Sequence, residues 1–137
     1  MYKNKKILIT GGTGSLGTAL TKRLLSMGVE QIRIFSRNEF KQISMESEIH
    51  DDRLRFLIGD VRDQKRLRRA IEDVDIVFHA AALKHVPKIE YNPFEAIKTN
   101  VEGSQNVIDA CLENDVERAV CIAVSYTHLT LPTICSV

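Results

Sequence analysis

The chain has 137 residues, 44% hydrophobic and 27% charged, which is ordinary for one globular domain with its own core. The formal net charge of +1 gives no reason to expect nucleic acid or an anionic membrane as a partner. No apolar run is long enough for a signal peptide or a membrane segment, so we expect a cytoplasmic protein. Three cysteines without Cys-x-x-Cys spacing predict neither a disulfide framework nor a metal site.

The first predicted element is an apolar strand over Lys6–Thr10, followed by glycines and an amphipathic helix over residues 15–27. Such a turn presents backbone N–H groups and the positive end of a helix to a pyrophosphate. Gly11 turns the chain, Gly14 lets backbone approach the phosphates, and Gly17 allows close packing of helix on sheet. A plain connector would also use glycines, but the position before a helix favours dinucleotide binding. The predicted contacts are Gly11, Thr13, Gly14, Ser15, Leu16 and Gly17.

The chain then alternates between strands and helices. Strands are predicted over residues 31–36, 53–59, 75–79 and 118–124, and helices over about ten residues from 38, over 63–72 and from 92 to about 114. This alternation predicts an α/β fold, a Rossmann-type doubly wound parallel sheet with strand order 3-2-1-4-5. We expect residues 1–125 to form this domain, which stops after the fifth strand.

The end of the second strand bears on the choice of cofactor. An acidic residue there would accept hydrogen bonds from the ribose of NAD, whereas a basic one accommodates the extra phosphate of NADP. The chain carries Ser36 and Arg37, with Lys41 one turn further on. A hydroxyl and two cations suit a phosphate, although solvated charges are also common at a helix start. NADP is therefore the predicted cofactor, ahead of NAD.

The third and fourth strands end in further candidate contacts. Asp60 and Val61 would flank the adenine by a hydrogen bond and an apolar contact, and a turn-capping role for Asp60 is the alternative. Small side chains follow the histidine of the fourth strand and leave room for the nicotinamide ribose, or else serve tight packing. These small residues are Ala80, Ala81 and Ala82. His79 and His85 are interpreted as structural, because no metal-ligand spacing surrounds them.

Several stretches resemble one family, the extended short-chain dehydrogenase/reductases that include the inverting UDP-N-acetylglucosamine 4,6-dehydratases and related polysaccharide-biosynthesis (CapD-like) proteins. They include Ile9-Thr-Gly-Gly-Thr-Gly-Ser-Leu-Gly17, Gly59-Asp-Val-Arg-Asp63, His79-Ala-Ala-Ala-Leu-Lys-His-Val-Pro87 and Thr99-Asn-Val101. The resemblance implies a tightly held NADP that oxidises a nucleotide sugar at C4, loss of water across C5 and C6, and return of the hydride at C6. A C4 epimerase of the same superfamily, or a non-catalytic dinucleotide-binding module, is the alternative.

The same resemblance implies roles for two polar residues. It places Lys84 at the active site as a catalytic residue, where residue type alone would indicate a solvated surface charge. It gives Asn100 the task of bending its helix or holding a water near the cofactor, where the alternative is a polar helix face. The sugar itself, and the homo-oligomeric assembly of the parent enzyme, are not indicated by these residues.

The resemblance stops at Ser125. The family continues with an Asp-Lys pair and a Tyr-x-x-x-Lys pair that act in acid/base chemistry, and neither occurs in this chain. Residues 126–137 carry no Asp, Glu, Lys or Arg, unlike the charged chain before them. We therefore expect an N-terminal fragment of a longer enzyme, inactive alone, with a non-native tail that is poorly ordered and leaves the fifth strand as an exposed edge.

Overall fold

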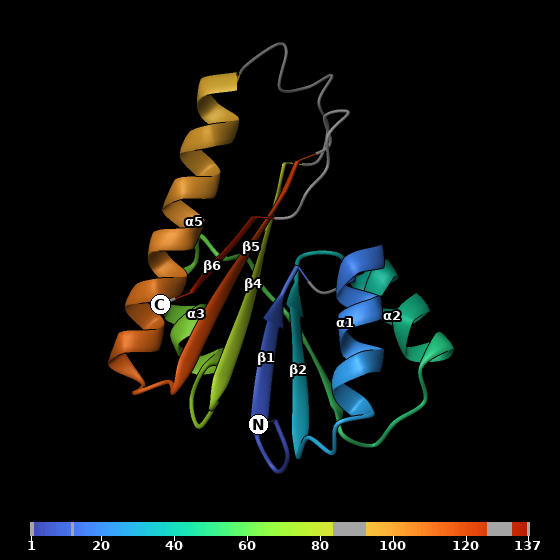
Figure 1. The fold of residues 1–137 in the computed structure, drawn as a ribbon. Helices are drawn as coiled ribbons and strands as arrows, with labels where there is room; N and C mark the ends of the chain where they lie inside the picture. Colours follow the sequence, from blue (N-terminus) through green and yellow to red (C-terminus); the bar gives the residue numbers. More distant parts are fainter. Residues whose placement is uncertain (1, 12, 84–92, 126–132, 137) are drawn as a thin grey trace.

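A computed structural model of the chain describes residues 2–11, 13–83, 93–125 and 133–136 (Figure 1). For Ser15 and for residues 80–83, 93–102, 122–125 and 133–136 only the backbone is described. The strands are β1 (Lys6–Thr10), β2 (Gln31–Ser36), β3 (Leu54–Ile58), β4 (Ile76–Leu83), β5 (Arg118–Ser125) and β6 (Thr133–Ser136). The helices are α1 (Ser15–Leu25), α2 (Glu39–Glu48), α3 (Gln64–Ala70) and α5 (Pro93–Glu113).

The strands form one sheet in the order β3-β2-β1-β4-β5-β6. The first five strands of the chain pair in parallel, with Thr10 of β1 beside Phe35 of β2 and His79 of β4. The predicted Rossmann-type fold and its order 3-2-1-4-5 are confirmed. Because all five parallel strands run the same way, their carboxyl ends meet at one edge of the sheet, where such folds bind ligands.

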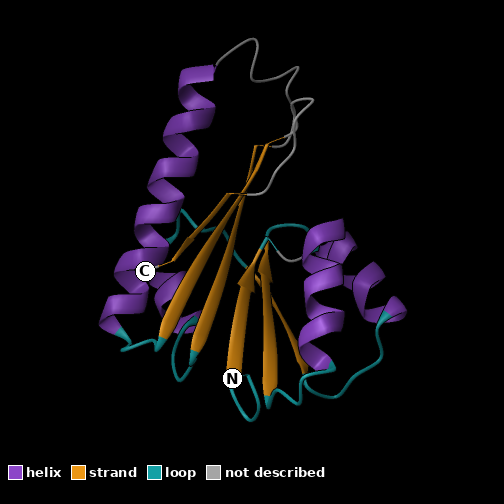
Figure 2. Ribbon diagram, in the orientation of Figure 1, coloured by secondary structure: helices purple, strands orange, loops and turns teal. Residues whose placement is uncertain are grey.

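Alternating side chains of the strands build a core on each face of the sheet. On one face Ile7 and Ile9 pack with the buried residues of α1 and α2, among them Leu24 and Met45. On the other face Leu8 belongs to a cluster with buried residues of α3 and α5. Figure 2 shows the helices in purple on the two sides of the orange sheet. The near-continuous apolar sequence of β1 follows from this arrangement, since both of its faces are covered.

The starts of two helices are capped by side chains of the residues that precede them. The Asn38 side chain accepts a hydrogen bond from the backbone N–H of Lys41 at 3.0 Å and begins α2. The Asp63 side chain accepts from the backbone N–H of Arg66 at 3.1 Å and begins α3. Side-chain acceptors at this position satisfy N–H groups that have no partner within the helix. These caps fix where the chain leaves the edge of the sheet that carries the candidate site.

Three of the differences between the predicted elements and the structure affect the fold. β4 continues to Leu83, beyond the expected end at His79, because its pairing with β5 extends to that residue. α1 ends at Leu25 and a turn leads to Gly28, whose φ of 78° lies in the left-handed region. The prediction of an exposed edge at β5 is wrong: Val120–Ala123 pair with β6 in antiparallel fashion. The β-branched Thr133 and Ile134 suit a strand, and β6 satisfies the backbone groups that an edge would leave unpaired.

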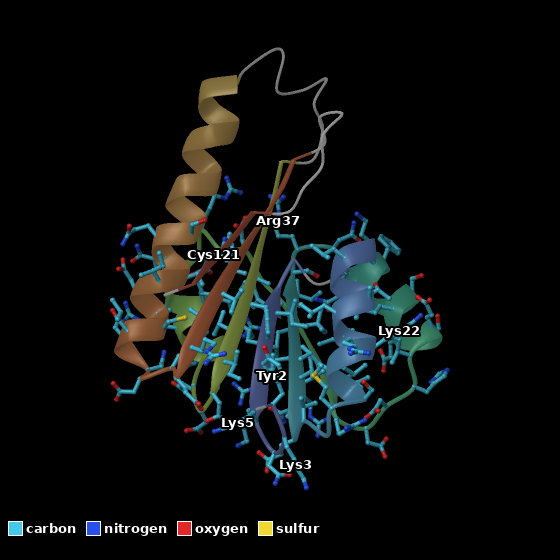
Figure 3. The ribbon with its side chains drawn as sticks, viewed as in Figure 1. Tyr2, Lys3, Lys5, Lys22, Arg37 and Cys121 are labelled. Atoms are coloured by element: carbon cyan, nitrogen blue, oxygen red, sulfur yellow. The ribbon has the colours of Figure 1, made fainter. Side chains whose placement is uncertain are left out.

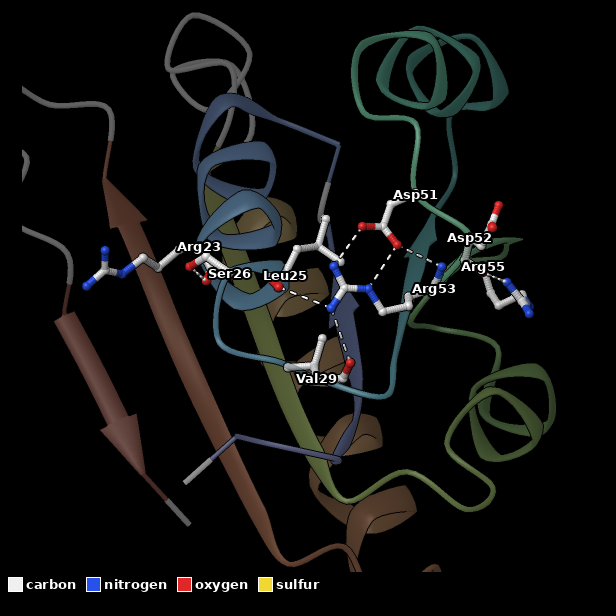
Figure 4. A network of polar contacts seen from close by, with 8 residues as sticks. All are labelled: Arg23, Leu25, Ser26, Val29, Asp51, Asp52, Arg53 and Arg55. Carbon is white, nitrogen blue, oxygen red and sulfur yellow. Dashed lines mark hydrogen bonds and ion pairs between the residues drawn. The ribbon is translucent and has the colours of Figure 1, made fainter.

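A polar network ties the amino side of the sheet to the end of α1 (Figure 4). The Arg53 guanidinium donates to Asp51 at 2.9 and 2.7 Å and to the carbonyl oxygens of Leu25 and Val29 at 3.1 and 3.4 Å. These hydrogen bonds hold the pKa of Asp51 down at about 2. Arg53 therefore places positive charge and donors on the last carbonyl of α1, where the helix dipole is negative.

Candidate functional site

The carboxyl end of β1 turns sharply into the glycine loop. Gly11 has a φ of 65°, a left-handed conformation that favours glycine, and its N–H donates to the carbonyl oxygen of Phe35 at 2.9 Å. The predicted role of Gly11 in turning the chain off the strand is therefore seen in the backbone. The hydrogen bond fixes the loop against the end of β2, which carries the residues expected to choose the cofactor.

The amino end of α1 has no side-chain cap. Its N-cap residue Gly14 is extended, with φ −77° and ψ 177°, and no acidic residue lies in the first turn. No acidic side chain of this turn therefore compensates its N–H groups and the positive end of the helix dipole. Gly17 is buried and accepts a hydrogen bond from the Thr21 hydroxyl at 2.7 Å. An anion such as a diphosphate fits this helix end, as the glycine spacing predicts.

Two cations follow β2 near the same edge of the sheet. The side chain of Arg37 is 72% exposed and lies beyond the arrowheads of β1 and β2 in Figure 3. Lys41 is exposed in the first turn of α2. Ser36 is buried, and its hydroxyl accepts a hydrogen bond from the Gln42 amide at 2.9 Å. The structure thus places Arg37 and Lys41 in solvent, whereas Ser36 is already partnered within the protein.

Asp60 connects the end of β3 with two arginines. Its carboxylate accepts from the Arg62 guanidinium at 2.8 to 3.2 Å and from the Arg62 backbone N–H at 2.9 Å, and lies 3.8 Å from the Arg37 guanidinium. The hydrogen bond from the Arg62 side chain is the main cause that lowers the pKa of Asp60. The backbone contact is the turn-capping arrangement that the sequence offers as the alternative for Asp60. The Asp60 carboxylate also places a negative charge beside Arg37.

His79 lies at the centre of a buried polar chain. Its Nδ1 is 2.5 Å from the Thr10 hydroxyl of β1, and its Nε2 is 3.1 Å from the Ser104 hydroxyl of α5. Burial lowers the pKa of His79 to about 4, so the ring is neutral at pH 7. The contacts agree with the structural role expected for His79. Its two partners are 69 and 25 residues away in the sequence, and no local pattern points to them.

The remaining predicted site residues are placed by backbone only or lie outside the described residues. Thr13 is half-buried and Leu16 is 40% exposed in the loop and first turn of α1. Ser15 begins α1 and Asn100 lies within α5, but their side chains are not described. Lys84 and His85 lie outside the described residues. The small residues Ala80, Ala81 and Ala82 are in β4, paired with Ile122, Ala123 and Val124 of β5.

The part of the chain that the structure describes contains neither a membrane-spanning helix nor a cluster of metal-ligating side chains. No helix there is both long and apolar enough to cross a membrane. Among the same residues, no three or more His, Cys, Asp or Glu side chains gather where they could bind a metal ion.

Comparison with known families identifies the chain. The profile of the family described as "Polysaccharide biosynthesis protein" matches residues 7–127, nearly the whole chain. The chain belongs to this family. The family assignment agrees with the resemblance in the glycine turn and in the segment that begins at His79.

Two curated relatives illustrate the range of activities near this chain. It is 56% identical over 126 residues to "UDP-N-acetylglucosamine 4,6-dehydratase (inverting)" from Campylobacter jejuni, covering 91% of this chain and 37% of the relative. It is 46% identical over 127 residues to "UDP-glucose 4-epimerase" from Rickettsia conorii, covering 90% of this chain and 37% of the relative. The chain therefore spans little more than a third of the length of these family members.

Solved structures show the same fold. The X-ray structure of Pen from Bacillus thuringiensis matches with a TM-score of 0.83 and 44% identity, over 88% of this chain and 37% of Pen. DesIV from Streptomyces venezuelae, a dTDP-glucose 4,6-dehydratase solved with NAD bound, matches with a TM-score of 0.71 and 27% identity, over 83% of this chain and 38% of DesIV. The homologues of this chain thus include nucleotide-sugar dehydratases and epimerases of the short-chain dehydrogenase type.

Proposed function

We propose that the chain is the NADP-binding part of a nucleotide-sugar 4,6-dehydratase that acts on UDP-N-acetylglucosamine in polysaccharide or glycan biosynthesis. The observation that carries this proposal is the uncapped amino end of α1 at the same sheet edge as Arg37 and Lys41. The 56% identity to the Campylobacter jejuni dehydratase supports the activity. Residues 1–125 would be the cofactor domain, and residues 126–137 a non-native tail.

The residues present fit a dinucleotide phosphate. The N–H groups of the first turn of α1 would bind the diphosphate, with no acidic side chain of that turn to repel it. The exposed Arg37 and Lys41 would bind the 2′-phosphate, and a guanidinium can do so with two parallel hydrogen bonds. Asp60 and Val61 would lie along the adenine. The backbone at Ala80–Ala82 would run beside the nicotinamide ribose.

When bound, the cofactor would supply the hydride acceptor for oxidation of the sugar at C4. The chain's own part is to bind and orient it at the carboxyl edge of the sheet. His79, neutral and hydrogen-bonded to Thr10 and Ser104, would hold the end of β1 against the middle of β4 beside that position. Lys84 is proposed as a catalytic residue on the strength of the motif alone.

The cofactor assignment is tested by the affinities of the chain for NADP⁺ and NAD⁺. NADP⁺ should bind more tightly, and Arg37→Ala should weaken it by about 1–3 kcal/mol, the scale of a charge-assisted contact, while NAD⁺ changes little. Arg23→Ala is the matched control, because Arg23 is also exposed but lies in the last turn of α1. Equal affinity of the unmodified chain for both cofactors would refute the assignment.

The activity is tested on the product of the whole gene with UDP-N-acetylglucosamine as substrate. A dehydratase forms a 4-keto-6-deoxy sugar, whereas the second candidate, a C4 epimerase, forms the C4 epimer. The epimerase is the second candidate because this chain is 46% identical to the Rickettsia conorii protein. We expect the 137-residue chain to form neither product even when it holds cofactor. Formation of either sugar by the purified chain would contradict that expectation.

A further inference from the structure

The helix α5 contacts the segment after β3 at two points that the proposed function leaves without a role. Gly103 is buried against Val61: a Cβ built on Gly103 would lie 2.7 Å from Val61 Cγ2, so close that one of the two would have to shift. Asn106, three residues further along α5, is 4% exposed. Its amide nitrogen donates to the carbonyl oxygen of Val61 at 3.0 Å.

A third contact, between α3 and α5, fixes the orientation of the Asn106 side chain. The Gln64 side chain, in the first turn of α3, donates to the Asn106 amide oxygen at 2.9 Å. Asn106 therefore uses its oxygen on α3 and its nitrogen on the backbone of Val61. A buried amide with both ends paired has a single low-energy orientation, because turning it would leave buried polar groups unpaired. The position of Val61 relative to α5 is thus set by a steric limit at Gly103 and a hydrogen bond at Asn106.

We propose that Gly103 and Asn106 are positioning residues for the adenine side of the cofactor site, acting through the Asp60–Val61 segment; this inference rests on the proposed dinucleotide-binding function. Val61 packs partly buried against the core cluster of α3 and α5, so a shift of its backbone would be passed to its neighbour Asp60. Asp60 is predicted to flank the adenine by a hydrogen bond, and a carboxylate can accept such a bond only from the exocyclic amine of that base. Gly103 and Asn106 would therefore determine how well the chain distinguishes adenine from a base without that amine.

The test measures base selectivity, defined as the ratio of the Kd for reduced nicotinamide hypoxanthine dinucleotide phosphate to the Kd for NADPH. Hypoxanthine replaces the amine of adenine by a carbonyl. Gly103→Ala and Asn106→Ala should each lower this ratio by about three- to tenfold, because a displaced Asp60 carboxylate would lose part of its hydrogen bond to the amine. A residue that only stabilises the fold would weaken both ligands alike and leave the ratio unchanged.

Two further comparisons separate the proposed positioning role from a general loss of stability. In a Val61→Ala background the clash partner is gone, so adding Gly103→Ala should leave the ratio as it is in Val61→Ala alone. Gln105→Ala lies on the same turn of α5, is exposed, and contacts Asp109, so it should keep the unmodified ratio. Asn106→Ala introduces no clash and carries the test if Gly103→Ala does not fold.

The outcomes distinguish this inference from the function it rests on. Unchanged selectivity in both Gly103→Ala and Asn106→Ala, with NADPH still bound, would overturn the positioning role and leave the cofactor site standing. Failure of the unmodified chain to bind either dinucleotide would overturn the proposed function and this inference together. A lowered ratio in both variants, with an unchanged ratio in Gln105→Ala, would support the role.

Discussion

The two ends of α1 differ in how far neighbouring residues compensate their unpaired backbone groups and the helix dipole. At its carboxyl end Arg53 donates to the carbonyl oxygens of Leu25 and Val29, and Lys22 and Arg23 lie in the last turn. At its amino end Gly14 provides no cap, and no acidic residue occupies the first turn. A helix gains stability when both ends are compensated. Among the described residues, only the end away from the carboxyl edge of the sheet is compensated, which agrees with the anionic ligand proposed for the other end.

The largest stability effect is expected at His79, which lies in the middle of β4 beside the carboxyl end of β1. Its pKa is about 4 in the folded chain and 6.5 as the ordinary value, so the unfolded chain binds a proton that the folded chain excludes. The free energy of unfolding should therefore fall as pH drops from about 6.5 to 4, by on the order of 3 kcal/mol. Denaturant unfolding across this pH range measures the effect.

The control for His79 is a pair of glutamine variants. His79→Gln should be less stable at pH 7 than the unmodified chain, because its contacts to Thr10 and Ser104 are disturbed, yet it should lose less stability on acidification. His50→Gln, at an exposed position, should retain the full acid sensitivity. An unchanged pH dependence in His79→Gln would show that His79 is not the group responsible.

The next largest effect is expected at the compensated end of α1. Arg53→Ala removes donors from two carbonyl oxygens and the partner of Asp51, and should lower the free energy of unfolding by about 2 kcal/mol, a value reduced for partial exposure. Asp51 has a lowered pKa of about 2, so its contribution is present above pH 4 and is lost as pH falls through 2. Arg55→Ala, on the neighbouring exposed arginine, should cost much less (Figure 4).

A single substitution can give the amino end of α1 the cap and the negative charge that its first turn lacks. Gly14→Asp places a capping carboxylate where the backbone is extended, so it should raise stability by about 0.5 kcal/mol. The same carboxylate would occupy the N–H groups and repel a diphosphate, so NADP⁺ affinity should be largely lost. Gly14→Ala adds a side chain without a cap or charge and is the control. Retained NADP⁺ affinity in Gly14→Asp would place the diphosphate elsewhere.

The smallest effect is expected from removal of residues 126–137. If this tail is foreign to the fold, deletion should change the melting temperature by no more than about 4 °C, less than 1 kcal/mol. It should leave NADP⁺ affinity unchanged and improve solubility. Loss of folding or of cofactor binding would instead make β6 an integral strand of the sheet.

The parts of the fold that follow from local sequence were predicted closely. The bounds of β1 and β2, the start of a helix at residue 38 and the turn at Gly11 agree with the structure because each depends on a few adjacent residues. The glycine spacing likewise predicted the open helix end. Such features need no knowledge of which elements pack together.

Contacts between distant segments were not predicted from the sequence. The bonds of His79 to Thr10 and Ser104 arise only once the sheet places β4 beside β1 and α5 over it. The limit that Val61 sets on Gly103 is of the same kind, since a glycine within a helix gives no sign of its neighbour. The pairing of β6 with β5 does not follow from the local sequence, because a segment without charged residues there predicts a tail outside the sheet.

The proposal that the amino end of α1 binds an anionic ligand is tested most directly by amide NMR during titration with NADP⁺. The account predicts that the largest changes occur in the backbone N–H signals of residues 14–17, with smaller ones at Gly11 and Arg37. Signals near Leu25 and Arg53, at the compensated end, should change little. Changes centred on the Arg53 end of the helix, with residues 14–17 unaffected by saturating NADP⁺, would contradict it.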